Sequence, residues 1–461
     1  MDVVQQLKQF MEPKSMAIIG ASRRTGEEAF SILENLLSYD YQGRVYPVNP
    51  NASEILGVKT YPSIGKLPEK VDLVVITLPR SLVPGVVKEC VDTHISAITI
   101  VTQGFTDAAD EEGKRLQNEI DNLIKGNETR ILGPNTFGTA NAYIDFSSSF
   151  IQAKMEKIPV GLICQTGAFF EGFANVRLLG KGIDLGNACD IDLADALEYF
   201  EQDADIEVIA LHIEGVRDGR RFLEAAKRAA AKKPVVALKT GRSGQAAQAA
   251  QSHTGSLAGK DEIWDSALKE AGVIRASDIV DFCDVIRAFY VLPSMPAEKI
   301  GIATYTGGYG IMAVDACERF GLELAQLSSA TVNRLSALSP SWLAVGNPVD
   351  IWPAVMISKH PLSQMEQAAV KSLLGDEQVN AVLCIFNPIT PALYIEMRQM
   401  VEEVTQDYPD KPVVFHIFGP LSHEAKIELE KTGKTLVFPS ADRAVRVLSH
   451  LANYSQLRLN S

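Results

Sequence analysis

Short apolar runs rich in β-branched residues alternate along the chain with amphipathic stretches of helical length. Alternation of this kind predicts parallel strands that are joined by crossover helices. The first series predicts strands at Ser15–Gly20, Arg44–Val48, Asp72–Leu78, Ala97–Thr102 and Arg130–Gly133, with helices at Glu28–Leu37 and Asp110–Ile124. Together these elements make one complete doubly wound unit.

The same pattern returns twice further along the chain. The second series predicts strands at Pro159–Cys164, Glu207–Ile213, Pro234–Lys239 and Val273–Ala276, and the third at Ile300–Tyr305, Val379–Phe386, Pro412–Phe418 and Thr435–Phe438. Two prolines in the segment LPSMPAEK indicate a linker between these two series. We therefore predict an α/β fold of three doubly wound units, at residues 1–145, 150–292 and 297–461.

The composition narrows the class of protein. Of the 461 residues, 46% are hydrophobic and 22% charged, which is typical of globular domains. The net charge of −13 disfavours nucleic acid or an anionic membrane as the main partner, because both need a basic surface. The six cysteines are scattered without a CxxC pair, and this favours reduced thiols over a disulfide framework or a zinc site. With neither a signal peptide pattern nor a long apolar run, we expect a cytoplasmic protein.

Glycine and proline end the predicted strands of the first unit, where ligands of open parallel sheets bind. The first strand ends at Gly20, and its loop reads GASRRTG instead of the dinucleotide fingerprint GxGxxG. This loop alone is equally compatible with a nucleotide site and with a bare turn. The strands that stop near Pro50, Pro79 and Gly104 favour an open crevice. Asn49 stands where an NAD enzyme carries the acid that holds its ribose, which argues against a dehydrogenase.

Two further strand-to-helix junctions are rich in threonine and glycine. They are Gln165-Thr166-Gly167 in the second unit and Thr306-Gly307-Gly308 in the third. Helix N-termini offer unpaired N–H groups and a partial positive charge, so they attract phosphate. Each junction by itself is equally compatible with a simple turn, but the pair indicates two helix dipoles aimed at anions.

His253 is the histidine whose surroundings most favour chemistry. It lies in TGRSGQAAQAAQSHTGSLAGK, a segment of small and polar residues, and long loops of this kind inside compact domains are usually functional. A neutral imidazole is a good nucleophile towards phosphoryl groups at cellular pH. Glu214 follows a predicted strand and precedes a glycine, so its carboxylate is displayed at a strand end and can orient an imidazole. Solvated loop positions are the alternative interpretation for both residues.

The chain resembles a known family, the α subunits of nucleoside-diphosphate-forming acyl-CoA synthetases of the ADP-forming acetate–CoA ligase type. This family is related to succinyl-CoA synthetase. The resemblance covers essentially the whole chain. The motifs that carry it are SMAIIGAS, VYPVNP, ILGPNTFG, QTGA, the strand end Ile213-Glu214-Gly215 and, above all, SHTGSLAG. It implies a Rossmann-like CoA-binding domain followed by two flavodoxin-like ligase domains, the first of which carries a phosphohistidine loop.

The resemblance also implies roles for individual residues. It identifies His253 as the phosphorylated histidine and Glu214 as the carboxylate that orients it. Phosphate is held by Gln165, Thr166 and Gly167 and by Gly307 and Gly308. Coenzyme A contacts the strand ends of the first unit, at Gly20, Ala21, Ser22, Arg23, Val48, Asn49, Pro50, Thr77, Leu78, Pro79, Gln103 and Gly104, with Asn135 near its thiol and acyl end.

The reaction implied is the reversible conversion of a carboxylic acid, CoA and ATP into acyl-CoA, ADP and phosphate, by way of an acyl phosphate and a phosphohistidine. No ATP-grasp domain is recognisable in the chain. The resemblance therefore implies a separate ATP-grasp β subunit that holds ATP or ADP and Mg²⁺, in an α2β2 heterotetramer, and no metal site in this chain.

Two departures from the family pattern stand at the helix junctions. Ser-Gln-Ser-Gly is usual where this chain has Cys164-Gln165-Thr166-Gly167, and Asn-Ala-Gly-Gly where it has Tyr305-Thr306-Gly307-Gly308. Since Thr166 keeps a hydroxyl, we expect phosphate binding to survive the first departure, whereas the second affects a subunit contact. The alternative hypothesis is a CoA-binding regulatory or scaffold protein without catalysis, against which the presence of both His253 and Glu214 speaks.

Overall fold

The computed structural model describes residues 2–243, 261–357 and 361–459. Within these ranges the chain forms two compact units, Met1–Ser277 and Asp278–Ser461, each of which is described by itself. The first unit holds two large sheets and the second unit holds one. The domain ranges predicted from the sequence remain predictions, because the units are defined by spatial contacts alone.

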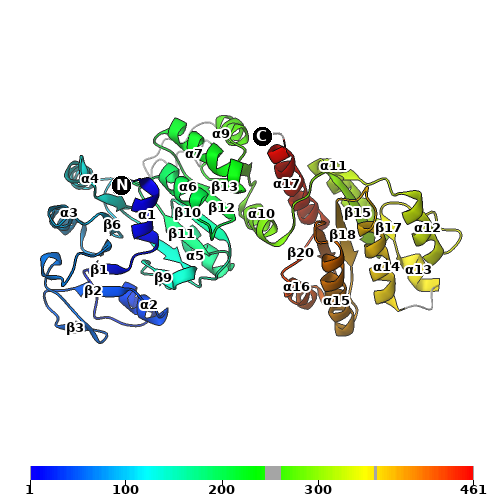
Figure 1. Cartoon of the computed structure of the whole chain (residues 1–461), viewed down its shortest axis with the longest axis horizontal. Coiled ribbons are helices and arrows are strands. Elements are labelled where there is room, and N and C mark those ends of the chain that lie inside the picture. Colours follow the sequence, from blue (N-terminus) through cyan, green and yellow to red (C-terminus); the bar gives the residue numbers. More distant parts are fainter. Residues whose placement is uncertain (1, 244–260, 358–360, 460–461) are drawn as a thin grey trace. The chain divides into compact units, whose positions relative to one another are not determined.

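The first sheet of unit 1 is wholly parallel and has the strand order β2-β1-β5-β6-β7 (Figure 1, blue and cyan). Its strands are β1 (Ser15–Ile19), β2 (Arg44–Val48), β5 (Leu73–Ile76), β6 (Ala97–Ile100) and β7 (Arg130–Leu132), and its helices are α1 (Val3–Met11), α2 (Ile32–Ser38), α3 (Val83–Asp92) and α4 (Glu111–Ile124). A small hairpin of β3 (Glu54–Ile55) and β4 (Val58–Lys59) follows β2. All five predicted strands are confirmed. The predicted helix from Glu28 instead begins at Ile32, because Phe30 takes a left-handed conformation and Ser31 caps the helix.

The second sheet has the order β14-β13-β12-β10-β11-β8-β9. Its strands are β8 (Thr139–Asn141), β9 (Phe146–Ser147), β10 (Val160–Cys164), β11 (Lys181–Asp184), β12 (Val208–Ile213), β13 (Val235–Lys239) and β14 (Ile274–Arg275), with helices α5 (Gly167–Asn175), α6 (Leu193–Gln202), α7 (Gly219–Lys232) and α9 (Asp261–Glu270). Five strands run parallel, and β8 and β9 add an antiparallel edge. The sequence pattern did not predict β8, β9 or β11, because these strands are short and contain glycine and polar residues. The tertiary structure satisfies those residues: Lys181, for example, pairs with Asp203 at 2.7 Å.

The sheet of unit 2 is parallel and has the order β16-β15-β18-β19-β20, with β17 paired to β15. Its strands are β15 (Lys299–Thr304), β16 (Glu323–Leu324), β17 (Val349–Asp350), β18 (Ala381–Phe386), β19 (Val413–Ile417) and β20 (Leu436–Phe438). Its helices are α10 (Ile279–Val291), α11 (Gly307–Phe320), α12 (Ser329–Leu338), α13 (Trp352–Ile357), α14 (Leu362–Leu374), α15 (Pro391–Asp407), α16 (Ser422–Glu430) and α17 (Ala441–Leu459). Helix α10 belongs to this unit, where its Asp284 pairs with Arg443 of α17 at 2.6 Å.

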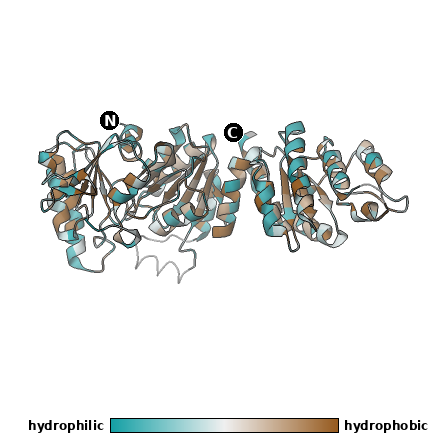
Figure 2. Ribbon diagram, turned by 90° about the horizontal axis from the view of Figure 1, so that it is seen from below, coloured by the Kyte–Doolittle hydropathy of each residue, from teal (hydrophilic) through white to brown (hydrophobic). Residues whose placement is uncertain are grey.

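Burial explains why these segments become strands and helices. The central strands are apolar on both faces and lie between helices whose outer faces are polar, which Figure 2 shows as brown strands between partly teal helices. In α4, Leu116 and Ile120 are buried one turn apart, and Asp110 caps the helix by accepting from Gly113 N–H. Across the part of the chain that the structure describes, no helix combines the length and apolar character needed to cross a membrane.

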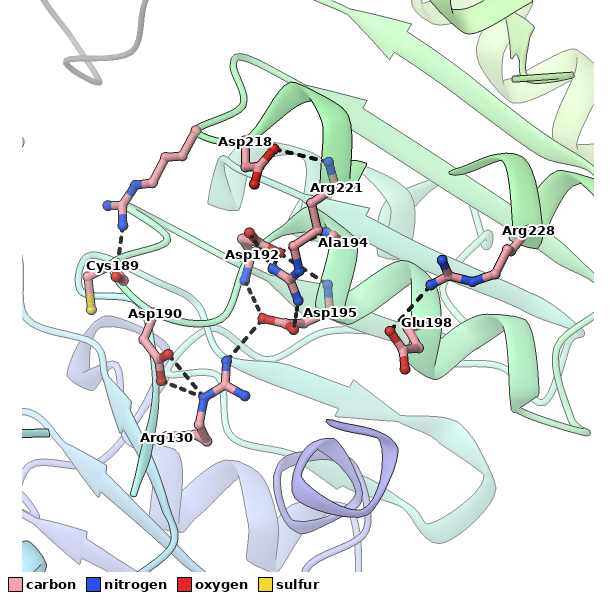
Figure 3. Close-up of polar contacts among 11 residues, drawn as sticks. Arg130, Cys189, Asp190, Asp192, Ala194, Asp195, Glu198, Asp218, Arg221 and Arg228 are labelled. Atoms are coloured by element: carbon pink, nitrogen blue, oxygen red, sulfur yellow. Dashed lines mark hydrogen bonds and ion pairs between the residues drawn. The ribbon is translucent and has the colours of Figure 1, made fainter. Parts of the chain in front are cut away.

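An ion-pair network joins the two sheets of unit 1 (Figure 3). Arg130, which begins β7 of the first sheet, pairs with Asp190 at 2.9 Å and with Asp195 of α6 at 3.0 Å. Asp195 is 1% exposed and also accepts from Arg221 of α7. Because a buried carboxylate is costly unless it is paired, this network sets the position of the first sheet against α6 and α7. The network thereby joins the start of β7 to the helices that pack on the second sheet.

Candidate active site

The strand ends of the first sheet bring the predicted CoA residues together. Gly20 N–H donates to the carbonyl of Val48 over 3.2 Å, and Asn49 Nδ2 donates to the carbonyl of Ala21 over 3.1 Å. On the other side, Thr77 donates to the carbonyl of Ile19 from both its N–H and its hydroxyl, each over 3.0 Å. The ends of β2, β1 and β5 therefore lie along one continuous edge of the sheet, where the sequence predicts the CoA crevice.

Gly20 is closely packed at this edge of the sheet. Its φ is +92°, and a Cβ atom there would lie 2.9 Å from Thr77 Oγ1 and 3.0 Å from a methyl carbon of Leu78. Only glycine tolerates both the backbone conformation and this spacing. In the loop that follows this turn, the predicted residue Ser22 is partly exposed and Arg23 is exposed.

The crevice continues along the ends of β5 and β6. Thr102 donates from its hydroxyl to the carbonyl of Leu78 over 2.7 Å, and Arg80 donates to the carbonyl of Gly104 over 2.8 Å. The predicted residues Pro50, Pro79 and Gln103 are exposed at its rim. The geometry thus places the predicted CoA residues from Gly20 to Gly104 along one edge of the sheet, while their binding role remains a prediction.

Asn135 links this crevice to the second sheet. Its N–H donates to the carbonyl of Thr102 over 3.0 Å, and its side-chain amide lies 3.4 Å from Asn187 Oδ1. Asn187 in turn donates to Asp107 over 2.7 Å. A residue expected near the reacting end of CoA therefore lies between the two strand edges of unit 1.

A cavity of about 430 Å³ opens at the carboxyl ends of β10, β11 and β12. Its lining comes from the segments that follow these strands, together with Thr106 and the start of α6: Thr106, Gln165, Gly186, Asn187, Ala188, Asp192, Leu193, Ala194, Glu214, Gly215, Val216, Arg217, Asp218 and Phe222. Strand β10 precedes both of its neighbours in sequence, so the cavity lies at the switch point of the strand order, where ligands of such sheets bind. Two of the predicted residues, Gln165 and Glu214, line it.

Gln165 and Glu214 are directly connected. The Gln165 side-chain oxygen accepts from Glu214 N–H over 2.7 Å and from Gly215 N–H over 3.2 Å. Gln165 therefore uses its carbonyl group to hold the backbone of the predicted carboxylate. Its amide nitrogen, which can only donate, is the part that suits an anion.

Thr166 and Gly167 begin α5 beside this pair. The Thr166 hydroxyl makes no capping hydrogen bond, so it does not occupy the first N–H groups of the helix. A Cβ atom on Gly167 would lie 2.2 Å from the Phe137 ring, which restricts this position to glycine. In unit 2, Thr306 has the same backbone conformation before Gly307 and Gly308, but its hydroxyl accepts from Tyr309 N–H over 3.3 Å. Convergence of the two helix starts on one phosphate remains a prediction.

Two histidines that lie on apolar strands are buried. His253 lies outside the described residues. His212 is 1% exposed, lies 3.2 Å from the Thr240 hydroxyl and stacks on Phe169; burial, reinforced by the nearby Lys239 charge, lowers its pKa to about 3, so it stays neutral. His416 is also buried and lies 3.2 Å from the carbonyl of Phe438. Among the described residues, no group of three or more acidic, histidine or cysteine side chains could hold a metal ion.

Two residues at this site were missed by sequence reasoning. Lys239 ends β13 and donates to the carbonyl of Glu214 over 3.0 Å; a charged residue at the end of the apolar run VVALK was a usable signal. Asp184 ends β11 and is fully buried. Its segment, GKGIDLGN, was not predicted as a strand, so the sequence carried no comparable signal for Asp184.

Asp184 holds the loop that carries Asn135. Its carboxylate accepts from Phe137 N–H over 2.7 Å and from the Thr136 hydroxyl over 3.3 Å. The thiol of Cys164 lies 3.7 Å away. Burial raises the pKa of Asp184 from 3.8 to about 6, although the hydrogen bond from Phe137 N–H opposes this shift.

Asp184→Asn is expected to change how stability depends on pH. Between about pH 4 and 6 the folded protein keeps a proton on Asp184 that the unfolded chain has released, so this group's contribution to stability falls as pH rises through that window. The total is about 2–3 kcal/mol. Asparagine does not titrate. The difference between the thermal unfolding midpoints, variant minus wild type, should therefore increase from about pH 4 to 7. Parallel curves for the two proteins would contradict the raised pKa.

Comparisons with known proteins agree with this organisation. Residues 14–142 match the CoA binding domain, residues 157–289 the succinyl-CoA ligase like flavodoxin domain, and residues 300–457 the ligase-CoA domain. The α subunit of ADP-forming acetate–CoA ligase I of Pyrococcus furiosus is 33% identical over 98% of both chains. The ADP-forming acetate–CoA ligase of Methanocaldococcus jannaschii is 34% identical over 98% of this chain, which spans 64% of that protein's length.

A solved structure gives the same result for the fold. A dinucleotide-forming acetyl-coenzyme A synthetase 1 of Ca. Korarchaeum cryptofilum, in complex with phosphate and ADP, superposes with a TM-score of 0.88 at 28% identity, covering 98% of this chain and 97% of that one. The predicted family resemblance and α/β fold class are therefore confirmed. The chain belongs to the family of ADP-forming acetate–CoA ligases, within which it matches an α subunit over nearly the full length of both chains.

Proposed function

We propose that this chain is the α subunit of an ADP-forming acyl-CoA synthetase, which converts a carboxylic acid, CoA and ATP reversibly into acyl-CoA, ADP and phosphate. The observation that carries the proposal is the placement of Glu214 at a switch-point cavity next to the CoA crevice, in a chain that matches an α subunit almost end to end. A cytoplasmic location is part of the proposal, because the six cysteines are free thiols.

The proposed chemistry avoids direct attack on a carboxylate, which is a poor electrophile. The γ-phosphoryl group of ATP moves to a ring nitrogen of His253, so that the bond to ADP breaks and a P–N bond forms. The P–N bond then breaks as a carboxylate oxygen of the acid takes the phosphoryl group, giving an acyl phosphate. Finally the CoA thiolate attacks the acyl carbon and phosphate leaves. Each transfer replaces one bond to phosphorus or carbon by another.

The residues of unit 1 suit these steps. The Glu214 carboxylate accepts the second N–H of the His253 imidazole, which fixes the attacking nitrogen and stabilises the charge that develops on the ring. The N–H groups at the start of α5 stabilise the phosphoryl oxygens. Asn135 lies between the edge of the first sheet and the cavity. In this proposal it contacts the thiol and acyl end of CoA.

A partner completes the proposed reaction. We propose an ATP-grasp β subunit that binds ATP or ADP with Mg²⁺, in an α2β2 heterotetramer. The α-subunit name of the Pyrococcus furiosus relative supports a separate partner chain, and the greater length of the Methanocaldococcus jannaschii relative leaves room for that part within one chain.

Phosphorylation from the acyl-CoA side tests the proposal without the partner. The chain is incubated with a panel of acyl-CoA compounds and labelled inorganic phosphate. At least one compound should transfer label to the protein, and this label should be acid-labile, alkali-stable and lost in His253→Ala. CoA binding without any label would contradict the proposal and favour a CoA-binding scaffold.

A further inference from the structure

Lys239 reaches Glu214 from the neighbouring strand. In the register of β12 and β13, Lys239 pairs with Ile213, the residue before Glu214. Lys239 is 2% exposed. The ammonium donates to the carbonyl of Glu214 over 3.0 Å and also to the carbonyl of Thr240. It lies 5.3 Å from the centre of the Trp264 ring, which covers it from α9.

The ammonium is buried, and no carboxylate of the described residues forms an ion pair with it. The charges of Asp261 and Glu214 nevertheless act on it, and that of Arg275 opposes them. Burial is the main cause that lowers the pKa of Lys239. Buried charges are usually paired because desolvation is costly. The burial of Lys239 without an ion pair therefore indicates a role other than ion pairing.

Lys239 acts on the backbone of Glu214. Its N–H is held by the Gln165 side chain and its carbonyl by the Lys239 side chain. With both flanking peptide groups held, the direction of the Cα–Cβ bond of Glu214 is set, and only the side-chain rotamer remains to be chosen. Gln165 directly follows β10 and Lys239 ends β13, and both contact Glu214, which directly follows the strand between them, β12.

We propose that Lys239 is a positioning residue that, together with Gln165, clamps the backbone of Glu214 and so aims its carboxylate for phosphoryl transfer. The inference rests on the proposed function, since it assigns Lys239 a part in the step that uses Glu214. A charge-assisted hydrogen bond holds this carbonyl more firmly than a neutral donor would. A small displacement of a catalytic group is enough to slow a reaction strongly.

Two variants separate the role of Lys239 from general stability. Lys239→Met keeps the unbranched stem against Trp264 but removes the donor and the charge, whereas Lys239→Arg keeps both. With the acyl-CoA that labels the wild type best, Lys239→Met should lower the rate of protein labelling about 10- to 100-fold. Formation of the acyl phosphate, which does not use Glu214, should stay within about threefold, and Lys239→Arg should restore most of the labelling.

A double-mutant cycle tests whether Lys239 acts through Glu214. In a Glu214→Gln background, Lys239→Met should slow labelling by no more than about twofold. An equal loss in both backgrounds, or a parallel loss of labelling and acyl phosphate formation, would overturn the inference and indicate a structural role. If no acyl-CoA labels the wild type, the proposed function itself fails, which is a distinct result from failure of the clamp.

Discussion

Glu214→Gln is expected to slow labelling of the protein by phosphate by up to about 10⁴-fold, the loss caused by replacing a carboxylate that orients a catalytic histidine. Glutamine keeps the size of the side chain and the backbone contacts to Gln165 and Lys239, so the cavity should be preserved. What it loses is the negative charge that stabilises an imidazolium and selects its tautomer. The measurement is the rate of protein labelling in single-turnover experiments with acyl-CoA and labelled phosphate.

The matched control for this substitution is Glu224→Gln on α7. Glu224 is exposed and pairs only loosely with Arg220, at 3.7 Å, so the same chemical change should leave labelling unaltered. CoA affinity should be unchanged in both variants, because the crevice of the first sheet does not contain either residue. Labelling within about threefold of the wild type in Glu214→Gln would rule out the orienting role assigned to Glu214.

Gly20→Val is expected to weaken binding of CoA about 30- to 100-fold, the equivalent of about 2–3 kcal/mol. The first cause is backbone strain, since φ of +92° costs a residue with a side chain about 1–2 kcal/mol. The second is steric, because the new side chain would press on Thr77 and Leu78, which line the crevice. Titration calorimetry with CoA measures the change.

Gly57→Val separates strain from the crevice. Gly57 also has a positive φ, +78°, but a Cβ atom there meets nothing within 4 Å. This variant should show a lower unfolding temperature with CoA affinity unchanged. If both variants bind CoA as tightly as the wild type, the ligand does not use the Gly20 turn, and the proposed CoA crevice is wrong.

The fold was largely predictable because its strands are apolar on both faces. Runs such as Leu73–Ile76 and Val235–Lys239 stand out from the amphipathic helices around them, and the structure confirms both as strands. Short strands were not predicted, because they contain polar residues that are buried only through tertiary contacts. The burial of Lys181 and Asn141 depends on partners such as Asp203 and the carbonyl of Met11, which are distant along the chain.

The candidate site was predictable only in part. Glycine turns and strand-end residues such as Gly20 and Glu214 have local signals, because a sharp turn needs glycine and an acid after an apolar strand is displayed at its end. Asp184 has no such signal, since its role depends on hydrogen bonds from Thr136 and Phe137. A contact between distant segments leaves no local pattern in one sequence.

By itself, the sequence determined the fold class and the family, and it predicted the chemistry centred on His253 and Glu214, because periodicity and short motifs are local properties of the chain. Only the tertiary structure decided which groups hold Glu214. It showed that Gln165 and Lys239 hold Glu214 from two different strands, and that Asp184 holds the loop of Asn135. Parallel strands bring residues from separate segments to one edge, and the order of those strands is set by packing across the whole sheet.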